Sequence, residues 1–130
     1  MFWNRYLLPA FALAALVAAL NWLGNLKDYY YTTVWYDWPM HFLGGATIAA
    51  LLLWKLDFLD TPRLAWLRQP RNLILYVFAV GIAWEVFEVA FHLNSLSDQG
   101  YAWDTAHDLI MDVIGGAAVV WIARLTAQKR

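Results

Sequence analysis

The sequence predicts an all-α integral membrane protein with four transmembrane helices, and three observations predict this class. Hydrophobic residues make up 62% of the 130 residues and charged residues only 15%, which is too apolar for an ordinary water-soluble domain. Four apolar runs each approach the ~20 residues that cross roughly 30 Å of hydrocarbon. The nine tryptophans and seven tyrosines suit the bilayer interfaces, where amphipathic rings are favoured. A soluble helical bundle is the less favoured alternative.

The predicted helices cover residues 6–24, 38–54, 72–92 and 105–122 of a single domain, 1–130. A signal peptide is the alternative for the first run, because Arg5 and an alanine-rich stretch come early. The bulky Asn21-Trp22 pair that follows the run disfavours cleavage there. The four helices form two hairpins, 1–56 and 72–124, and a connector joins them at 57–71.

The distribution of lysine and arginine predicts that both termini lie in the cytoplasm. In that orientation eight of the nine basic residues face the cytoplasm, and only Lys27 faces outward. We therefore expect a cytoplasmic (inner) membrane protein whose connector rests on anionic lipid headgroups. The tyrosines at 29–31 predict an interfacial aromatic belt, with a stacking surface for a substrate as the alternative. The net charge of −1 gives no argument for nucleic acid, and the absence of cysteine excludes thiolate chemistry.

Acidic and histidine side chains gather toward the outward ends of three predicted helices. At about 100° per residue, the two glutamates of the third helix and the three aspartates of the fourth each form a stripe no wider than about 80°. Polar stripes in a membrane must face one another or a water-filled cavity. The candidate site therefore contains seven residues: Asp37, His41, Glu85, Glu88, Asp104, Asp108 and Asp112.

Burying six carboxylates in a bilayer needs compensation that the protein's own cations do not supply. A single aspartate at a helix centre costs about 2.5–3.5 kcal/mol, and Lys27 is the only basic residue expected on that side. Either several carboxylates are protonated or a bound cation balances them. Carboxylates with an imidazole suit a divalent metal cation (Mg²⁺, Mn²⁺, Fe²⁺ or Zn²⁺), so we predict that all seven residues are metal ligands.

Simple structural roles are the alternative for two of these residues. Asp37 and Asp104 are well placed to act as plain N-caps. His92 and His107 are interpreted as polar helix ends and not as ligands.

One phrase occurs twice in the chain. "DWPMHFLGGA" at 37–46 and "DLIMDVIGGA" at 108–117 share Asp-x-x-Met-[His/Asp]-x-x-Gly-Gly-Ala. Both lie on helices that run inward, so a doubled hairpin with a pseudo-two-fold axis along the membrane normal is the simplest explanation; chance similarity is the alternative. The glycine pairs would let the two backbones approach closely and bring the acidic turns to one shared ion.

The blocks "YDWPMHF", "WEVFE" and "DQGYAWDTAHDLIMDVIGGA" resemble the YjdF-type inner-membrane proteins over about residues 36–120. More distantly, they are similar to the VanZ-like proteins linked to glycopeptide resistance. The resemblance marks as family positions Asp37, His41, Glu85, Glu88, Asp104 and Asp108. Asp112 departs from the VanZ-like pattern, in which asparagine is usual.

The sequence alone leaves three functions open. The first is a metal-dependent enzyme for a lipid-linked or envelope substrate at the outer leaflet, with Glu85 or Glu88 as the catalytic base. The second is a non-catalytic envelope protein with a structural cation. The third is a cation or proton transporter, which the absence of titratable residues in the inner halves of the helices disfavours. Membrane lipids are the expected partners, and formation of a homodimer is left open.

Overall fold

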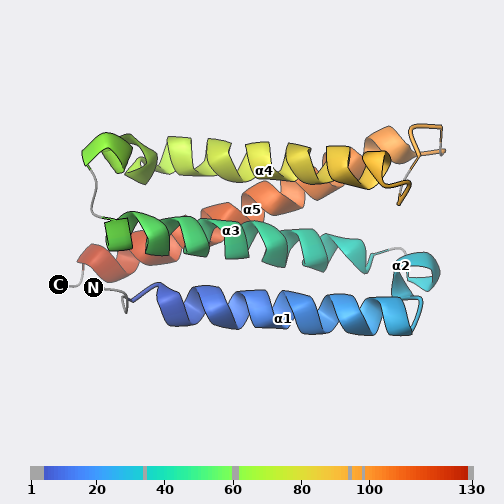
Figure 1. Ribbon diagram of the computed structural model, residues 1–130, viewed down its shortest axis with the longest axis horizontal. Helices are drawn as coiled ribbons and strands as arrows, with labels where there is room; N and C mark the ends of the chain where they lie inside the picture. Colours follow the sequence, from blue (N-terminus) through green and yellow to red (C-terminus); the bar gives the residue numbers. More distant parts are fainter. Residues whose placement is uncertain (1–4, 34, 60–61, 94, 98, 129–130) are drawn as a thin grey trace.

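The computed structural model describes residues 5–33, 35–59, 62–93, 95–97 and 99–128, and this part of the chain contains helices and no strands. The elements are α1 (Leu7–Leu26), α2 (Tyr29–Thr32), α3 (Asp37–Leu59), the 3-10 helix η1 (Pro62–Arg68), α4 (Pro70–Ala90) and α5 (Tyr101–Gln128) (Figure 1). By length and composition, α1, α3, α4 and α5 can each cross a membrane. The predicted all-α class with four membrane-crossing helices is confirmed.

The helix bounds follow the local sequence, and each helix extends past its predicted span at one end or both, most of all α3 and α5. α3 continues to Leu59 where we expected an end at residue 54, and α5 begins at Tyr101 where we expected residue 105. η1 lies in the middle of the connector, and Pro70 then takes the first position of α4, where a missing N–H costs nothing. Gly100, with φ of 92°, accepts hydrogen bonds from the Trp103 and Asp104 amides and so starts α5 ahead of its apolar run.

The four long helices run alternately up and down, so α3 and α5 are parallel to each other (Figure 1). These two pack together most extensively, α1 lies against α3, and α4 lies against α5 and less against α3. The start of α1 and the end of α5 share one end of the bundle, called here the terminal end. The starts of α3 and α5 and the end of α4 share the other, called the acidic end. The predicted convergence of the acid-bearing helix ends is therefore present.

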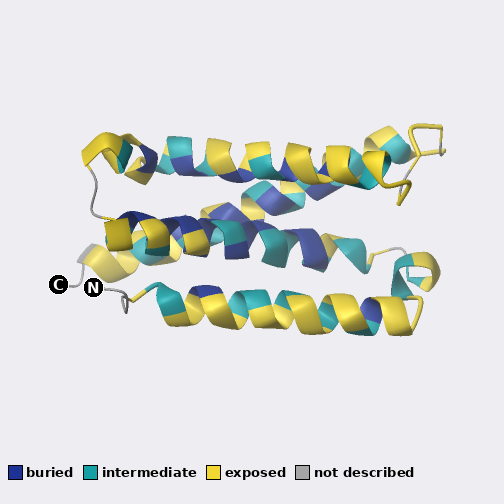
Figure 2. Cartoon of the chain, in the orientation of Figure 1, coloured by how far each residue is buried: buried dark blue, intermediate teal, exposed yellow. Residues whose placement is uncertain are grey.

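Burial is concentrated on α3 and on the faces that surround it (Figure 2). In the most apolar stretch of each helix, 44% of α3 is buried but only 11% of α1, so α3 is central and α1 is peripheral. Toward the terminal end the core is entirely apolar: Ala49, Leu52, Leu53, Leu56, Leu67, Leu73, Val77 and Val120. Large outward side chains such as Phe11 and Trp121 suit contact with lipid.

Tyrosines of the segment between α1 and α3 attach these two helices to each other. The Tyr36 hydroxyl donates to the Leu20 carbonyl at 2.7 Å, and the Tyr30 hydroxyl donates to Oδ1 of Asn21 at 2.9 Å. Both rings pack over Gly24, where a Cβ would lie within 2.8 Å of them. Burial, with a smaller contribution from Asp37, raises the pKa of Tyr30 to about 12, so its hydroxyl stays a neutral donor. The aromatic belt itself stays a prediction.

The two Gly-Gly pairs lie where α3 crosses α5. A Cβ on Gly45 would collide with the backbone carbonyl of Asp112, and a Cβ on Gly115 would collide with that of Phe42. Only glycine permits backbone contact this close between helices. Gly44 is different, because its Cβ would meet only Oδ1 of Asp112, at an ordinary 3.8 Å.

This contrast predicts opposite outcomes for neighbouring glycines. Gly45→Ala or Gly115→Ala should force α3 and α5 apart and destabilise the bundle by about 1–3 kcal/mol. Gly44→Ala should be neutral or should stabilise by up to about 1 kcal/mol, because alanine favours helix. Thermal unfolding of the purified chain in detergent, followed by circular dichroism, measures both. Equal melting temperatures for Gly44→Ala and Gly45→Ala would contradict the proposed crossing.

Candidate metal centre at the acidic end

The close crossing of α3 and α5 brings the two repeated segments together, and the segments run in the same direction. Asp37 and His41 on the first two turns of α3 face Asp108 and Asp112 on α5. These positions correspond in the repeat, since Asp37 matches Asp108 and His41 matches Asp112. The residues of the repeat are thus brought together as a cluster of side chains. That they bind one shared ion stays a prediction, and so does duplication of the hairpin.

His41 occupies the middle of this cluster. Its Nε2 lies 3.7 Å from Oδ1 of Asp37 and 3.9 Å from Oδ2 of Asp108. One donor atom from each of these three residues lies within 4.8 Å of the others. The group is therefore a potential set of metal ligands, and it is also a set of ion pairs whenever the imidazole is protonated.

Asp112 approaches the opposite edge of the same imidazole. Its Oδ2 lies 3.4 Å from Nδ1 of His41. Space for this carboxylate comes from Gly81 on α4, because a Cβ there would lie 2.6 Å from Oδ2 of Asp112. Asp112 therefore contacts His41 on the side away from Asp37 and Asp108.

The cluster is shielded from solvent and incompletely paired. The exposed fractions are 8% for His41, 2% for Asp108 and 7% for Asp112, while Asp37 is half-buried. Oδ1 of Asp108 is fully buried and has no hydrogen-bond partner among the described residues. A buried carboxylate oxygen without a partner loses its hydration and gains nothing in return. The site therefore favours a cation or a proton at this oxygen.

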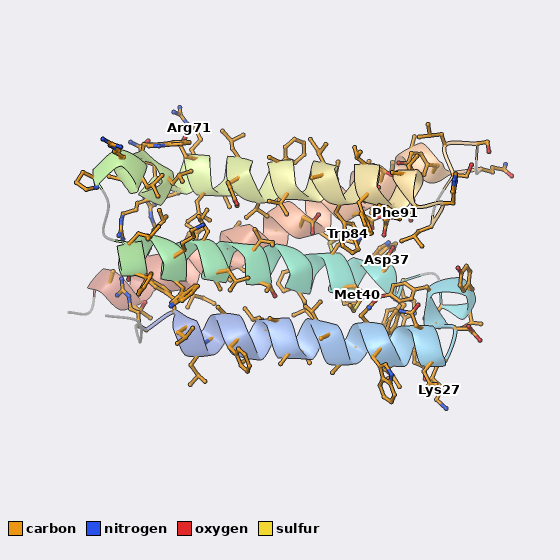
Figure 3. All side chains as sticks on the ribbon, in the orientation of Figure 1. Lys27, Asp37, Met40, Arg71, Trp84 and Phe91 are labelled. Atoms are coloured by element: carbon orange, nitrogen blue, oxygen red, sulfur yellow. The ribbon has the colours of Figure 1, made fainter. Side chains whose placement is uncertain are left out.

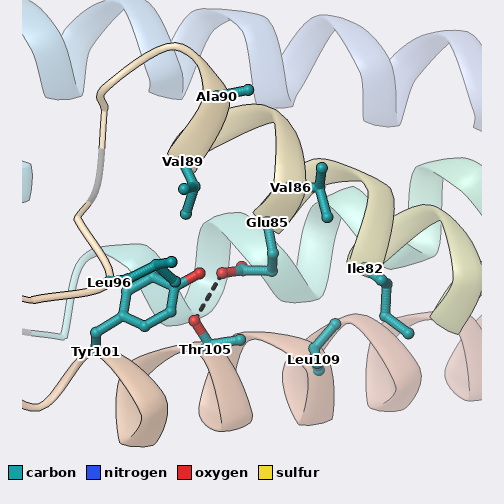
Figure 4. Close-up of a pocket in the computed structure, with 9 residues that line it drawn as sticks. All are labelled: Ile82, Glu85, Val86, Val89, Ala90, Leu96, Tyr101, Thr105 and Leu109. Atoms are coloured by element: carbon teal, nitrogen blue, oxygen red, sulfur yellow. Dashed lines mark hydrogen bonds between the residues drawn. The ribbon is translucent and has the colours of Figure 1, made fainter.

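Glu85 of α4 lies beside the cluster and bonds across to α5. Its Oε2 accepts a hydrogen bond of 2.8 Å from the Thr105 hydroxyl, as Figure 4 shows. The side chain is 5% exposed, and its Oε1 has no hydrogen-bond partner within the described chain. It also lines a cavity of about 400 Å³ between α4 and α5. Glu85 lies within electrostatic range of Asp108, but the compact group of potential ligands does not include it.

The two remaining predicted residues, Glu88 and Asp104, lie outside the compact group. Glu88 is half-buried, accepts a 2.9 Å hydrogen bond from Nε1 of Trp84, and lies within electrostatic range of Asp37 and His41. Asp104 is exposed in the first turn of α5 and lies within electrostatic range of Asp37. Neither belongs to the compact group, so their role as ligands stays a prediction.

The other two histidines lie outside the cluster. The His107 ring stacks on Trp38, with centroids 5.4 Å apart, and meets the edge of Trp103 at 4.6 Å. His92 is exposed in the turn after α4, with a φ of 57°. Both positions agree with polar helix ends.

No described basic side chain compensates the cluster. Lys27 lies at the acidic end but points away from the bundle, and Arg71 lies toward the terminal end (Figure 3). Among the described residues, His41 is the side chain paired with these acids that can carry a positive charge. A single imidazolium cannot balance the carboxylates gathered around it.

Thr105 and Gly81 contribute to the site but were not predicted. Thr105 lies three residues before Asp108 and thus on the same face of the helix, so its helical spacing could have revealed it. Gly81 carries no such signal, because only the packing of α4 against α5 places Asp112 next to it.

Comparisons with known proteins agree with this membrane architecture. Neither the search of curated proteins nor the search of solved structures found a match. The more distant resemblance to VanZ-like proteins receives no support from these comparisons. Residues 3–129 match the family described as "Predicted membrane protein (DUF2238)", the same family that the YjdF resemblance indicated. The chain therefore belongs to the DUF2238 family of predicted membrane proteins.

Proposed function

We propose that this protein binds a divalent metal cation within the membrane, held by Asp37, His41 and Asp108. The observation that carries the proposal is the gathering of three donor atoms from two helices within 4.8 Å. A further feature of the same carboxylate supports it: Oδ2 of Asp108 faces His41, and the other oxygen, Oδ1, is buried and lacks a hydrogen-bond partner among the described residues. With the termini in the cytoplasm, the site would lie toward the outer leaflet.

The spacing of the donor atoms suits one ion after a small contraction. Two ligands at about 2.1 Å from a metal, at tetrahedral or octahedral angles, are roughly 3.0–3.4 Å apart. The separations from Nε2 of His41 are 3.7 Å to Asp37 and 3.9 Å to Asp108. The two aspartates would therefore have to move about 0.3–0.9 Å closer to Nε2 of His41, and the donor atoms of the third pair, Asp37 and Asp108, lie within 4.8 Å of each other before any such movement.

Asp112 is better placed to orient the histidine than to bind the ion. A metal-bound imidazole usually donates its second N–H to a carboxylate, which fixes the tautomer and raises the basicity of the ligand. Oδ2 of Asp112 lies 3.4 Å from Nδ1 of His41, while Nε2 faces the other two acids. We therefore assign Asp112 as a positioning residue.

A more specific proposal is that the protein is a metal-dependent enzyme that acts on a lipid-linked or envelope substrate. A divalent cation in such a site supplies Lewis-acid chemistry and lowers the pKa of bound water. Glu88 is half-buried and within electrostatic range of His41, so it can meet water and accept a proton as the base. The number of carboxylates at this end exceeds what one ion requires, which favours a role for some of them beyond holding it.

A structural cation is the second candidate, and one observation favours it. The proposed ligands span α3 and α5 next to their closest approach at Gly45 and Gly115. A cation there would hold together two helices that otherwise present acids to each other. Transport across the membrane has less support, because the buried core toward the terminal end is apolar throughout the described residues.

Metal content tests the proposal directly. The purified wild-type protein, loaded with Mn²⁺ or Zn²⁺ and then desalted, should retain about one ion per chain in elemental analysis. Asp108→Asn and His41→Ala should each remove a ligand and lower retention at least about tenfold. Asp57→Asn is the control, because Asp57 lies near the terminal end and pairs with Arg68. Equal retention in wild type and Asp108→Asn would overturn the site.

The role of Asp112 predicts an intermediate effect. An asparagine oxygen can still accept the Nδ1–H of His41 but without charge, so Asp112→Asn should weaken metal binding by about tenfold. Asp108→Asn should weaken it more, because a direct ligand is lost. Competition with a fluorescent chelator measures both affinities. A loss in Asp112→Asn that equals or exceeds the loss in Asp108→Asn would make Asp112 a ligand.

Glu88→Gln separates the catalytic from the structural role. If Glu88 is the base, this variant should keep the metal and the melting temperature of the wild type but lose turnover of envelope lipids by about 10²–10⁴-fold. Mass spectrometry of a lipid extract incubated with the metal-loaded protein measures turnover. If the wild type turns over no lipid while chelation lowers its melting temperature, the cation is structural.

A further inference from the structure

A groove follows the seam between α4 and α5 on the lipid-facing side of the acidic end. Its outer part is the cavity of about 400 Å³ that Glu85 lines (Figure 4). A second cavity of about 370 Å³ lies between Phe78 of α4 and Val113 and Ile114 of α5. Leu109 lines both cavities, so they adjoin at this residue. The side of the groove that α5 forms, from Tyr101 to Ile114, is roughly 20 Å long.

The accessible lining of the groove is almost entirely apolar, and its few polar groups lie at the outer end. Its polar lining residues are Glu85, Tyr101 and Thr105, all in the outer cavity. The Tyr101 and Thr105 hydroxyls and the Glu85 carboxylate point toward one another in Figure 4. The groove therefore matches an amphiphile whose polar head lies near the membrane surface and whose apolar chain extends toward the membrane centre.

The edges of the groove are open to the surroundings of the bundle. Val86 on α4 is 63% exposed and Ile110 on α5 is 55% exposed. In a bilayer these side chains face hydrocarbon, so a lipid chain can enter the groove sideways without crossing water. Between two membrane helices, such an apolar groove is filled by a lipid chain unless a protein surface covers it.

Glu85 indicates which headgroup fits. Its Oε2 is used by Thr105, and its Oε1 is buried without a hydrogen-bond partner in the described structure. A ligand that donates hydrogen bonds to this oxygen would remove the cost of burying it. Lys27 points away from the bundle at this end (Figure 3), and among the described residues His41 alone is paired with the clustered aspartates, which outnumber it. This surplus of acids favours a headgroup with positive charge.

We propose that the α4–α5 groove binds one alkyl chain of a membrane lipid whose primary ammonium headgroup donates to Glu85. An ammonium group offers three N–H donors and a positive charge, which match an orphaned carboxylate oxygen in an acidic surrounding. The residues of the groove differ from the proposed metal ligands, so lipid binding does not require the cation. If the protein is an enzyme, this lipid headgroup lies beside the reacting site and identifies the class of substrate.

Native mass spectrometry with matched lipids tests this inference. The full chain in detergent is titrated with dioleoyl phosphatidylethanolamine and with dioleoyl phosphatidylcholine, which has the same chains but no N–H donor. Both titrations contain EDTA, so that the outcome is independent of metal binding. We expect the ethanolamine lipid to bind about tenfold more tightly, since a charge-assisted hydrogen bond accounts for a difference of this size.

Variants assign this preference to the groove. Glu85→Gln keeps an acceptor for Thr105 but loses the charge, and it should abolish the preference. Asp28→Asn is the matched control, because it removes an acid from the same end outside the groove, and asparagine tolerates the left-handed backbone of Asp28. Leu109→Trp should block the groove and weaken both lipids, whereas Ile122→Trp on the exposed surface of α5 should not.

Two results would overturn the inference. One is equal binding of the two lipids by the wild type, and the other is an unchanged preference in Glu85→Gln. Since Glu85→Gln is nearly isosteric, it tests the inference even if Leu109→Trp fails to fold. A protein that binds the ethanolamine lipid but retains no metal would keep the groove and reject the proposed metal centre.

Discussion

The acidic end depends on the backbone contact between α3 and α5, where Gly45 meets the Asp112 carbonyl and Gly115 meets that of Phe42. Any side chain at either glycine would move the two helices apart. The contact sets Nε2 of His41 less than 4 Å from Asp108 on the facing helix. Glycine thus determines the chemistry here through the distance between helices and without contributing a functional group of its own.

The bundle places apolar packing and buried carboxylates at opposite ends, because these two conflict in a low-dielectric medium. Toward the terminal end, apolar side chains of α3, α4 and α5 form a continuous core, which supplies packing without polar cost. Toward the acidic end, buried carboxylates surround the His41 imidazole, and two carboxylate oxygens have no hydrogen-bond partner in the part of the chain that the structure describes. An arrangement of this kind persists only when packing elsewhere holds it or when a ligand completes it.

The proposed cation site and the proposed lipid groove share a boundary at Glu85. This side chain bonds to α5 through Thr105, lines the groove, and lies within electrostatic range of Asp108. A lipid headgroup at Glu85 would therefore lie next to a cation at Asp108. The two proposals use different residues, yet together they describe one amphiphile-binding centre that opens sideways to the bilayer.

Composition and helical spacing were sufficient to predict four membrane-crossing helices, the convergence of acids at one end, and the importance of the repeated Gly-Gly phrase. Only the tertiary structure decided which acids share a site: Asp108 is buried beside His41, whereas Asp104, one turn earlier, is exposed. It also placed Asp112 against Nδ1 of His41 and opened the groove between α4 and α5. The reason is that helical periodicity states which residues share a face, but the rotation and separation of neighbouring helices determine what that face meets.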